Sequence, residues 1–292
     1  MVCWSYNRMT QIITQLNPDV PPTGSDLGIV NAARKSFGRR SEWGVELYDD
    51  PTRDDYKYCK ESARYILKDK DKRLLEFLAR GMTAADFDDF CNDVQANIRE
   101  YLDGNKECVE TLIEQMWDWR NTPTHDTPFN HGFFSFEVKA PIFVARHLVK
   151  HEYLIMSEYS RRYITDDVEF YTPDVWRKAA ADVKQGSSAE GYTLREMYGW
   201  DTYDKDMYAV PLQQYKSLLG KGVAPEQARM VLPQSLMTSW TWSGTLGAFA
   251  NMCKLRLSSD TQAETRVVAQ AVYEELKKQF PVAAPLLVEG VL

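Results

Sequence analysis

The chain carries, at residues 124–163, the stretch THDTPFNHGFFSFEVKAPIFVARHLVKHEYLIMSEYSRRY, and this stretch decides our prediction of the fold. Apolar and polar residues alternate over 134–138, as they do in a strand with one buried face. Pro141 follows where a helix can begin, because proline is tolerated at the first helical position. We therefore predict a strand that runs directly into a helix, with Ala145 and Val149 among the residues that face the core.

The same stretch gathers ionisable side chains. It holds all four histidines of the chain, His125, His131, His147 and His151, and arginines follow closely. Further on, Glu158, Ser160 and Arg162 alternate, so in an extended segment all three side chains would point to one side. We interpret this grouping as the first sign of a functional site.

Helical patterns flank the stretch. Residues 24–38 predict a short helix capped by Ser25 or Asp26. Residues 44–121 are polar and have a helical period, with Thr83 as a candidate N-cap, so we interpret them as a helical insertion. Helices with few strands favour an α+β fold, here an antiparallel sheet with packed helices in a single domain that spans the whole chain.

A capping pattern precedes the last long helix. Thr261 and Glu264 form T-x-x-E, a capping box in which each side chain bonds the backbone N–H of the other residue. An apolar stripe follows over 268–276, and Pro281 ends the pattern. We therefore predict a helix between this capping box and the proline.

Composition excludes several classes of protein. The 292 residues carry a formal net charge of −7, which argues against a nucleic-acid-binding surface. No apolar run approaches the roughly 20 residues that a membrane span needs, and the N-terminus lacks the pattern of a signal peptide. The five cysteines form no C-x-x-C pair, so we predict a reduced cytoplasmic protein without a disulfide frame or a metal site.

Three arginines supply cations for an anionic ligand. The guanidinium forks of Arg162, Arg229 and Arg256 suit phosphate oxygens and the carbonyl edge of a pyrimidine. The chain has no G-x-G-x-x-G or G-x-x-x-x-G-K-[ST] loop and no G-x-S-x-G elbow. We therefore expect neither a Rossmann site, nor a P-loop, nor a serine hydrolase.

The ordered motifs resemble one enzyme family. The stretch 124–163 is similar to the signature H-x-T/S-P-F-E-H, strand, A/C-P-I-F-V-A-R-Q, R-H-R and E-x-S-x-R-Y of the flavin-dependent thymidylate synthases. Residues 228–266 resemble that family's A-R-x-V-L-P … N-x-R … N-x-x-x-x-R … A-Q-x-E, and residues 26–37 resemble D-L-x-x-V-x-A-A-R-x-S-F. Residues 40–122 have no counterpart in these motifs.

The resemblance implies a reaction and its cofactors. Members of the family methylate C5 of dUMP to give dTMP, with methylenetetrahydrofolate as carbon donor and FAD reduced by NADPH. They use no cysteine nucleophile, and they assemble as homotetramers with shared sites. The implied partner of this chain is therefore a pyrimidine deoxynucleotide monophosphate.

The resemblance also implies site residues. Arg256 matches the arginine that contacts the pyrimidine and favours its electron-rich form, which makes Arg256 the candidate catalytic residue. The candidate substrate-binding residues are His147, Lys150, Glu158, Ser160, Arg162, Arg229 and Arg256. The candidate FAD-binding residues are Ser36, His125, Thr127, Asn130, Lys150, His151, Glu152, Glu158, Thr245, Gly247 and Asn251.

Several of these positions depart from the family's pattern. The R-H-R triplet reads Lys150, His151 and Glu152, and the glutamine of the substrate pocket is His147. The N-x-R motif reads Thr245, Leu246 and Gly247, and the glutamate of P-F-E-H is Asn130. Two alternatives therefore stay open. One is a related flavin- and folate-dependent enzyme that hydroxymethylates a pyrimidine nucleotide or acts on another pyrimidine nucleotide. The other is a nucleotide-binding protein without turnover.

Overall fold

The computed structural model describes residues 11–49, 61–105, 108–120, 122, 124–181, 186–198 and 207–289. They form two compact units, each built from separate parts of the chain. The first unit combines residues 11–22, 134–244 and 251–275, and the second combines 23–133, 245–250 and 276–289, in each case as far as they are described. Among the described helices, none is long and apolar enough to cross a membrane.

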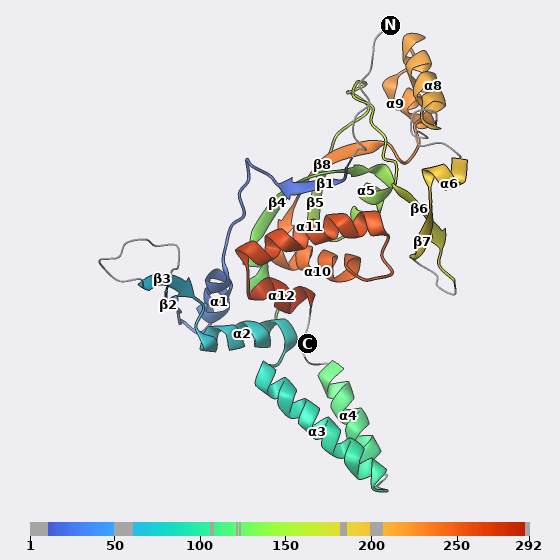
Figure 1. Ribbon diagram of the computed structural model, residues 1–292. Coiled ribbons are helices and arrows are strands. Elements are labelled where there is room, and N and C mark those ends of the chain that lie inside the picture. The colour runs from blue at the N-terminus through green and yellow to red at the C-terminus, as the bar shows by residue number, and fades with distance from the viewer. Residues whose placement is uncertain are drawn as a thin grey trace. The chain divides into compact units, whose positions relative to one another are not determined.

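A four-stranded sheet organises the first unit (Figure 1). Its strands follow the order β1 (Ile13–Leu16), β4 (Phe133–Pro141), β8 (Met237–Thr245) and β5 (Leu154–Glu158). β1 pairs antiparallel with β4, and β5 pairs antiparallel with β8. The alternation over 134–138 is confirmed as a strand, because Phe134, Phe136 and Val138 are buried.

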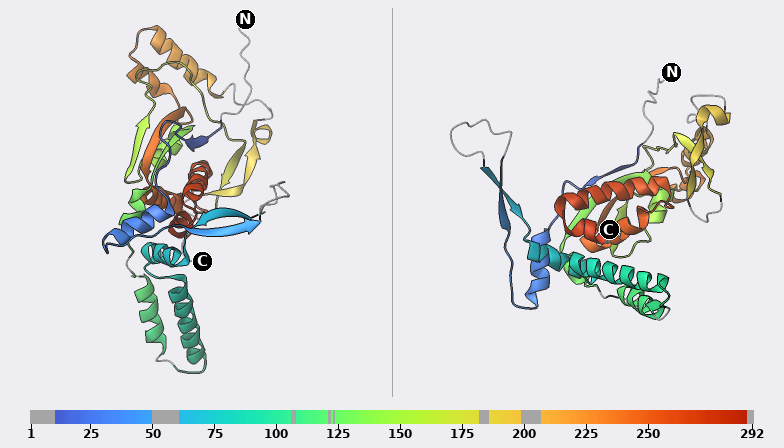
Figure 2. Two further views of the ribbon diagram at one scale, coloured as in Figure 1. Left: turned by 90° about the vertical axis from the view of Figure 1, so that its left-hand side faces the viewer. Right: turned by 60° about the horizontal axis from the view of Figure 1, so that its bottom comes forward.

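The two faces of this sheet differ in chemistry. Trp240 and Trp242 of β8 are each 1% exposed and join the apolar core. Helix α11 (Ala263–Gln279) and the end of α10 (Leu246–Arg256) lie side by side on one face (Figures 1 and 2). Between strands, polar side chains bond directly: Ser243 to Ser135 at 2.9 Å, and Thr241 to Glu137 at 2.7 Å. Alternation along the strands thus separates an apolar layer from a polar one.

Shorter elements complete the first unit. They are α5 (Ile142–Leu148), the hairpin β6 (Val175–Ala179) and β7 (Ser187–Thr193), α6 (Leu194–Tyr198), α8 (Ala209–Gly220), α9 (Pro225–Ala228) and the 3-10 turn η2 (Arg229–Val231). Pro141 ends β4 and stands at the N-cap of α5, one position before the predicted one. Ala145 is buried as predicted, but Val149 caps the helix and is 56% exposed.

The second unit contains α1 (Asp26–Lys35), α2 (Asp69–Arg80), α12 (Ala283–Val288) and the 3-10 turn η1 (Thr127–His131). Ser25 is the N-cap of α1, since its hydroxyl accepts the N–H of Gly28 at 3.1 Å. The buried carboxylate of Asp26 instead accepts the backbone N–H groups of Val282 and Ala283, which fastens α12 to the start of α1.

Two paired helices lie within the segment that the sequence predicts as a helical insertion. α3 (Ala84–Leu102) and α4 (Cys108–Arg120) are joined by an Asn97–Gln115 hydrogen bond of 2.8 Å. Thr83 caps α3 as predicted, in a reciprocal box with Asp86.

The beginning of the same insertion corrects the sequence prediction. The described residues at the start of this segment, 44–49 and 61–66, are not helical but form an antiparallel pair, β2 (Gly44–Asp49) and β3 (Glu61–Ile66). Val45 and Leu47 alternate with Glu46, which is a period of two residues and therefore typical of a strand. The polar composition of the longer segment concealed this short alternation.

Two further local predictions are wrong. β5 ends at Glu158, and the carbonyl of Ser160 accepts the N–H groups of Tyr163 and Ile164, so the segment after Glu158 turns instead of staying extended. At the start of α11, Thr261 donates to the carbonyl of Leu255, and the carboxylate of Glu264 receives a guanidinium. Tertiary partners thus take both side chains of the predicted capping box.

Candidate functional site

A histidine holds the candidate catalytic arginine in the first unit. Arg256 ends α10, and its Nε lies 2.8 Å from Nε2 of His151, which belongs to the turn after α5. An arginine Nε–H can only donate a hydrogen bond, so Nε2 of His151 must accept it. His151 is therefore neutral, with its proton on Nδ1, and the bond fixes the guanidinium through one edge. Among the described residues no hydrogen-bond partner holds the two Nη groups of Arg256, which are therefore available to a ligand.

The electrostatics support this protonation state. Burial, together with the charge of Arg256, lowers the pKa of His151 from 6.5 to about 4. Burial also lowers the pKa of Arg256, but a guanidinium remains charged in proteins. A fixed cation beside a neutral imidazole is thus present throughout the physiological pH range.

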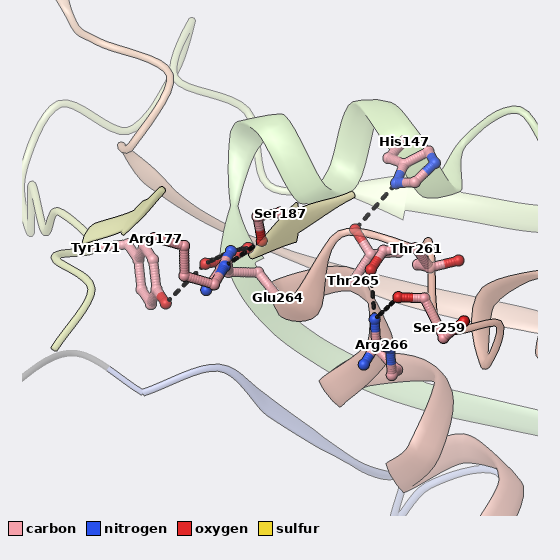
Figure 3. A network of polar contacts seen from close by, with 9 residues as sticks. All are labelled: His147, Tyr171, Arg177, Ser187, Ser259, Thr261, Glu264, Thr265 and Arg266. Atoms are coloured by element: carbon pink, nitrogen blue, oxygen red, sulfur yellow. Dashed lines mark hydrogen bonds and ion pairs between the residues drawn. The ribbon is translucent and has the colours of Figure 1, made fainter. Parts of the chain in front are cut away.

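A second histidine is positioned from α11. His147 of α5 has its Nδ1 3.0 Å from Oγ1 of Thr265, a fully buried residue, and Figure 3 shows the ring turned toward that hydroxyl. Burial and the charges of Arg256 and Lys150 lower the pKa of His147. The structure therefore brings together four of the candidate site residues, His147, Lys150, His151 and Arg256, and it adds Thr265, which no sequence pattern indicated.

The His151–Arg256 contact predicts a pH dependence. The unfolded chain takes up a proton at His151 near pH 6.5, whereas the folded chain does so near 4. The free energy of unfolding should therefore fall as the pH drops from 6.5 to 4, and His151→Gln should remove part of that fall. Urea unfolding of both proteins at several pH values measures the difference. Parallel curves for the two proteins would show that His151 does not titrate as assigned.

Three candidate substrate-binding residues line a small cavity in the same unit. Glu158, Ser160 and Arg229 are among the lining residues of this cavity of about 200 Å³. Thr238 donates to the Glu158 carboxylate at 2.8 Å, which fixes one of its oxygens. A neighbouring cavity of about 590 Å³ shares Glu158 and Arg229 and also includes Lys150. Ser160, Glu158 and Arg229 are therefore brought together as predicted.

Arg162 lies outside the lining of both cavities. Its side chain is 51% exposed, and its Nη2 is 3.6 Å from the Glu226 carboxylate. Arg229 donates to the backbone carbonyl of the same Glu226 at 3.3 Å. The two arginines thus meet at one residue.

Arg161 is the arginine of this segment that lines the cavity, and the sequence did not single it out. It is 9% exposed, and its guanidinium donates to the carbonyls of Asp166 and, at 2.7 Å, Asp167. These two hydrogen bonds from the Arg161 guanidinium hold the turn after β5, so Arg161 has a structural role there.

A large cavity in the second unit contains three candidate cofactor residues. Ser36, His125 and Thr127 belong to its lining, and its volume is about 1150 Å³. The backbone N–H of His125 donates to Leu78 at 2.8 Å, and its ring stacks on Phe77 with centroids 5.8 Å apart. The contribution of α2 to this cavity was not predicted from the sequence, because α2 lies outside the three motif blocks on which the site prediction rested.

Three departures from the family's pattern meet in the second unit. Thr245 donates to Oδ1 of Asn130 at 2.7 Å, and a Cβ built on Gly247 would lie 3.0 Å from the same oxygen. A side chain at 247 would therefore have to displace Asn130. Asn130, Thr245 and Gly247 thus replace the family's glutamate, asparagine and arginine with a neutral, closely packed group. The three positions have a net charge of zero in this chain, as they do in the family's motif, because the lost glutamate and the lost arginine cancel.

The remaining candidates are exposed. Glu152 lies in the turn between α5 and β5, next to Tyr153, whose φ is +62°. Asn251 of α10 is also exposed. Cys253 is buried, its thiol contacts the carbonyl of Ala269, and burial raises its pKa, so it is unsuited to act as a nucleophile.

Comparison with known proteins identifies the family of the chain. The family model described as "Thymidylate synthase complementing protein" matches residues 23–282. A flavin-dependent thymidylate synthase of Thermus thermophilus is 39% identical over 194 residues, which are 65% of this chain and 68% of that protein. One from Treponema denticola is 33% identical over 197 residues, 65% of this chain and 71% of that protein.

A solved structure shares the fold. The UMP/dUMP methylase PolB from Streptomyces cacaoi, bound with 5-Br dUMP, superposes with a TM-score of 0.64 at 23% identity and covers 97% of each chain. This likeness confirms the α+β fold with antiparallel sheets and packed helices. Together with the family match over most of the sequence, it confirms the resemblance of the three motif blocks, and the chain belongs to the enzyme family of the thymidylate synthase complementing proteins, the flavin-dependent thymidylate synthases.

Proposed function

We propose that this protein methylates dUMP at C5 to give dTMP, with FAD as cofactor and methylenetetrahydrofolate and NADPH as cosubstrates. Family membership supports the reaction class, and the observation that carries the proposal is the contact between Arg256 and neutral His151. A nucleotide-binding protein without turnover would not need a desolvated arginine held in one orientation. We further propose a cytoplasmic homotetramer.

Arg256 is proposed to act on the pyrimidine ring. Its Nε is engaged by His151, so its Nη groups are the ones that can face the ring carbonyl. A fixed cation at that carbonyl stabilises the negative charge that develops as C5 becomes nucleophilic. Because His151 already holds the guanidinium, little reorganisation is required during the reaction. His147, oriented by Thr265, is proposed to contact the same nucleotide.

The nucleotide phosphate is proposed to bind at Ser160 and Arg229, with Arg162 joining from the surface. The Arg162–Glu226 pair is long and exposed, and such pairs contribute little to stability. A phosphate, which accepts several charged hydrogen bonds, can therefore replace Glu226 as the partner of Arg162. Glu226 partly offsets the charge of Arg162 when no nucleotide is bound.

The flavin is proposed to bind in the cavity of the second unit that Ser36, His125 and Thr127 line. The volume of about 1150 Å³ is sufficient for a large part of a dinucleotide, and the cavity combines cationic and aromatic side chains. The closely packed group of Asn130, Thr245 and Gly247 supplies no cation for the flavin. A bound reduced flavin would supply the reducing equivalents of the reaction.

Product analysis tests the proposal. The purified protein should show a flavin absorbance band after incubation with FAD, and it should convert dUMP to a product heavier by one methylene group when NADPH and methylenetetrahydrofolate are present. Mass spectrometry of parallel reactions with dUMP and dCMP identifies both base and product. A hydroxymethylated product, or reaction only with dCMP, would support the related enzyme instead. Absence of flavin binding would refute the proposed cofactor.

A further inference from the structure

Helix α2 supplies two of the four cations that line the cavity of the second unit. Four cationic residues line this cavity, namely Arg34, Arg39, Lys70 and Arg73, whereas Asp126 is the single carboxylate among its lining residues. Lys70 and Arg73 belong to α2, which lies outside the three motif blocks of the sequence analysis. The cavity therefore attracts an anion partly through residues that those motif blocks did not single out.

The position of α2 is fixed by a buried carboxylate. Asp71 is fully buried and accepts Arg34 of α1 at 2.6 Å and the Ser41 hydroxyl at 2.8 Å. Lys70 precedes Asp71 and Arg73 follows it closely, so this anchor also determines where the two cations lie. Because Arg34 is neutralised by Asp71, it contributes less to the field in the cavity than the other cations do.

One face of α2 is arranged as a ligand surface. Lys70, Arg73, Leu74 and Phe77 all line the cavity, and their spacing of three and four residues places them on one side of the helix. The cations occupy its first half, and Phe77 stacks on His125 toward its end. Within the described residues, Lys72 pairs with Asp69, whereas no carboxylate pairs with Lys70 or Arg73.

We infer that Lys70 and Arg73 bind the diphosphate of the flavin dinucleotide, with its aromatic portion reaching toward Phe77 and His125. The inference rests on the proposed function. It explains how a member of the family with Gly247 and Glu152 in place of two cations retains an anionic cofactor: the charge comes from a different element, on the same cavity as Ser36 and Thr127. Two unpaired cations on adjacent turns suit two adjacent phosphates.

Flavin titrations test this assignment. The double variant Lys70→Gln/Arg73→Gln should bind FAD about 30-fold or more weakly than the wild type, as expected when two charged hydrogen bonds are lost. Its affinity for riboflavin, which has no phosphate, should stay unchanged. The matched control is Lys72→Gln, on the same helix but paired with Asp69, and its FAD affinity should remain within about two-fold of the wild type.

The outcomes separate the two proposals. If the wild type binds FAD and the double variant binds it equally well, the assignment of Lys70 and Arg73 is overturned while the proposed function stands. If the wild type binds no flavin, both are overturned. An equal loss of riboflavin affinity would indicate a damaged cavity and would also contradict a specific contact with phosphate; each single substitution, with circular dichroism as a check of folding, then repeats the test.

Discussion

Replacing Arg256 with alanine should lower kcat for dTMP formation by about 100- to 1000-fold, the loss seen when one preorganised electrostatic donor is removed. Nucleotide binding should weaken much less, because the charge of Arg256 is needed most when the pyrimidine becomes electron-rich. His151 holds the guanidinium at 2.8 Å, so alanine removes a group that is already in position. Steady-state kinetics combined with calorimetric titration of dUMP measure both effects.

The matched control is Lys254→Ala, since Lys254 is an exposed cation on the same helix, two residues before Arg256. Its kcat should stay within about two-fold of the wild type. Arg256→Lys keeps the charge but loses the Nε–H that His151 accepts, so its kcat should lie between those of the wild type and Arg256→Ala. An unchanged kcat in Arg256→Ala, with only a raised KM, would assign Arg256 to uniform binding of the nucleotide.

Replacing Glu264 with alanine should lower the free energy of unfolding by about 3 kcal/mol, because it removes one partner of a buried ion pair. The Glu264 side chain is 6% exposed, and both of its oxygens accept the Arg177 guanidinium, at 2.8 and 2.7 Å. Arg177 also donates to Ser187, so the pair fastens the β6–β7 hairpin to the start of α11 (Figure 3). Urea unfolding followed by circular dichroism gives the change.

An exposed ion pair in the same hairpin provides the control. Lys178 and Glu190 lie 3.0 Å apart, with side chains 41% and 76% exposed, so Glu190→Ala should cost less than about 0.5 kcal/mol. Equal losses for the two variants would mean that burial does not strengthen the Arg177–Glu264 pair. A useful internal marker is Tyr171, whose pKa burial and the Glu264 charge raise to about 12. In Glu264→Ala that pKa should fall toward its ordinary value.

Glu264 stabilises the fold of the first unit, and its neighbour Thr265 orients His147 in the candidate site. Adjacent on α11, they hold two different parts of the first unit, the β6–β7 hairpin and the ring of His147. The family motif predicts a glutamate at 264, and the T-x-x-E pattern offered a local role for it as a cap. Packing gives it a partner 87 residues away instead. A local capping bond competes poorly with a buried guanidinium, because leaving that cation unpaired is costly.

The sequence alone determined much of this protein. Alternation over 134–138, the caps at Ser25 and Thr83 and the helical periods after Asp69 all rest on interactions within a few residues, so they are readable before any tertiary contact forms. The identity of the family followed from three ordered motif blocks, and the types of residue in the site followed from those motifs. The strand pair of 44–49 and 61–66 was not predicted, because exposed apolar residues such as Val45, Leu47 and Tyr65 give these strands no buried face.

The contacts between distant site residues follow only from the tertiary structure. Asn130 and Thr245 are 115 residues apart, and His151 and Arg256 are 105 residues apart, yet each pair shares one hydrogen bond. Such pairs set the tautomer of His151, the space at Gly247 and the partner of Glu264. Hydrogen bonding and burial act over a few ångströms irrespective of distance along the chain, so a substitution that looks like a loss in the sequence is compensated by a neighbour that only the fold identifies.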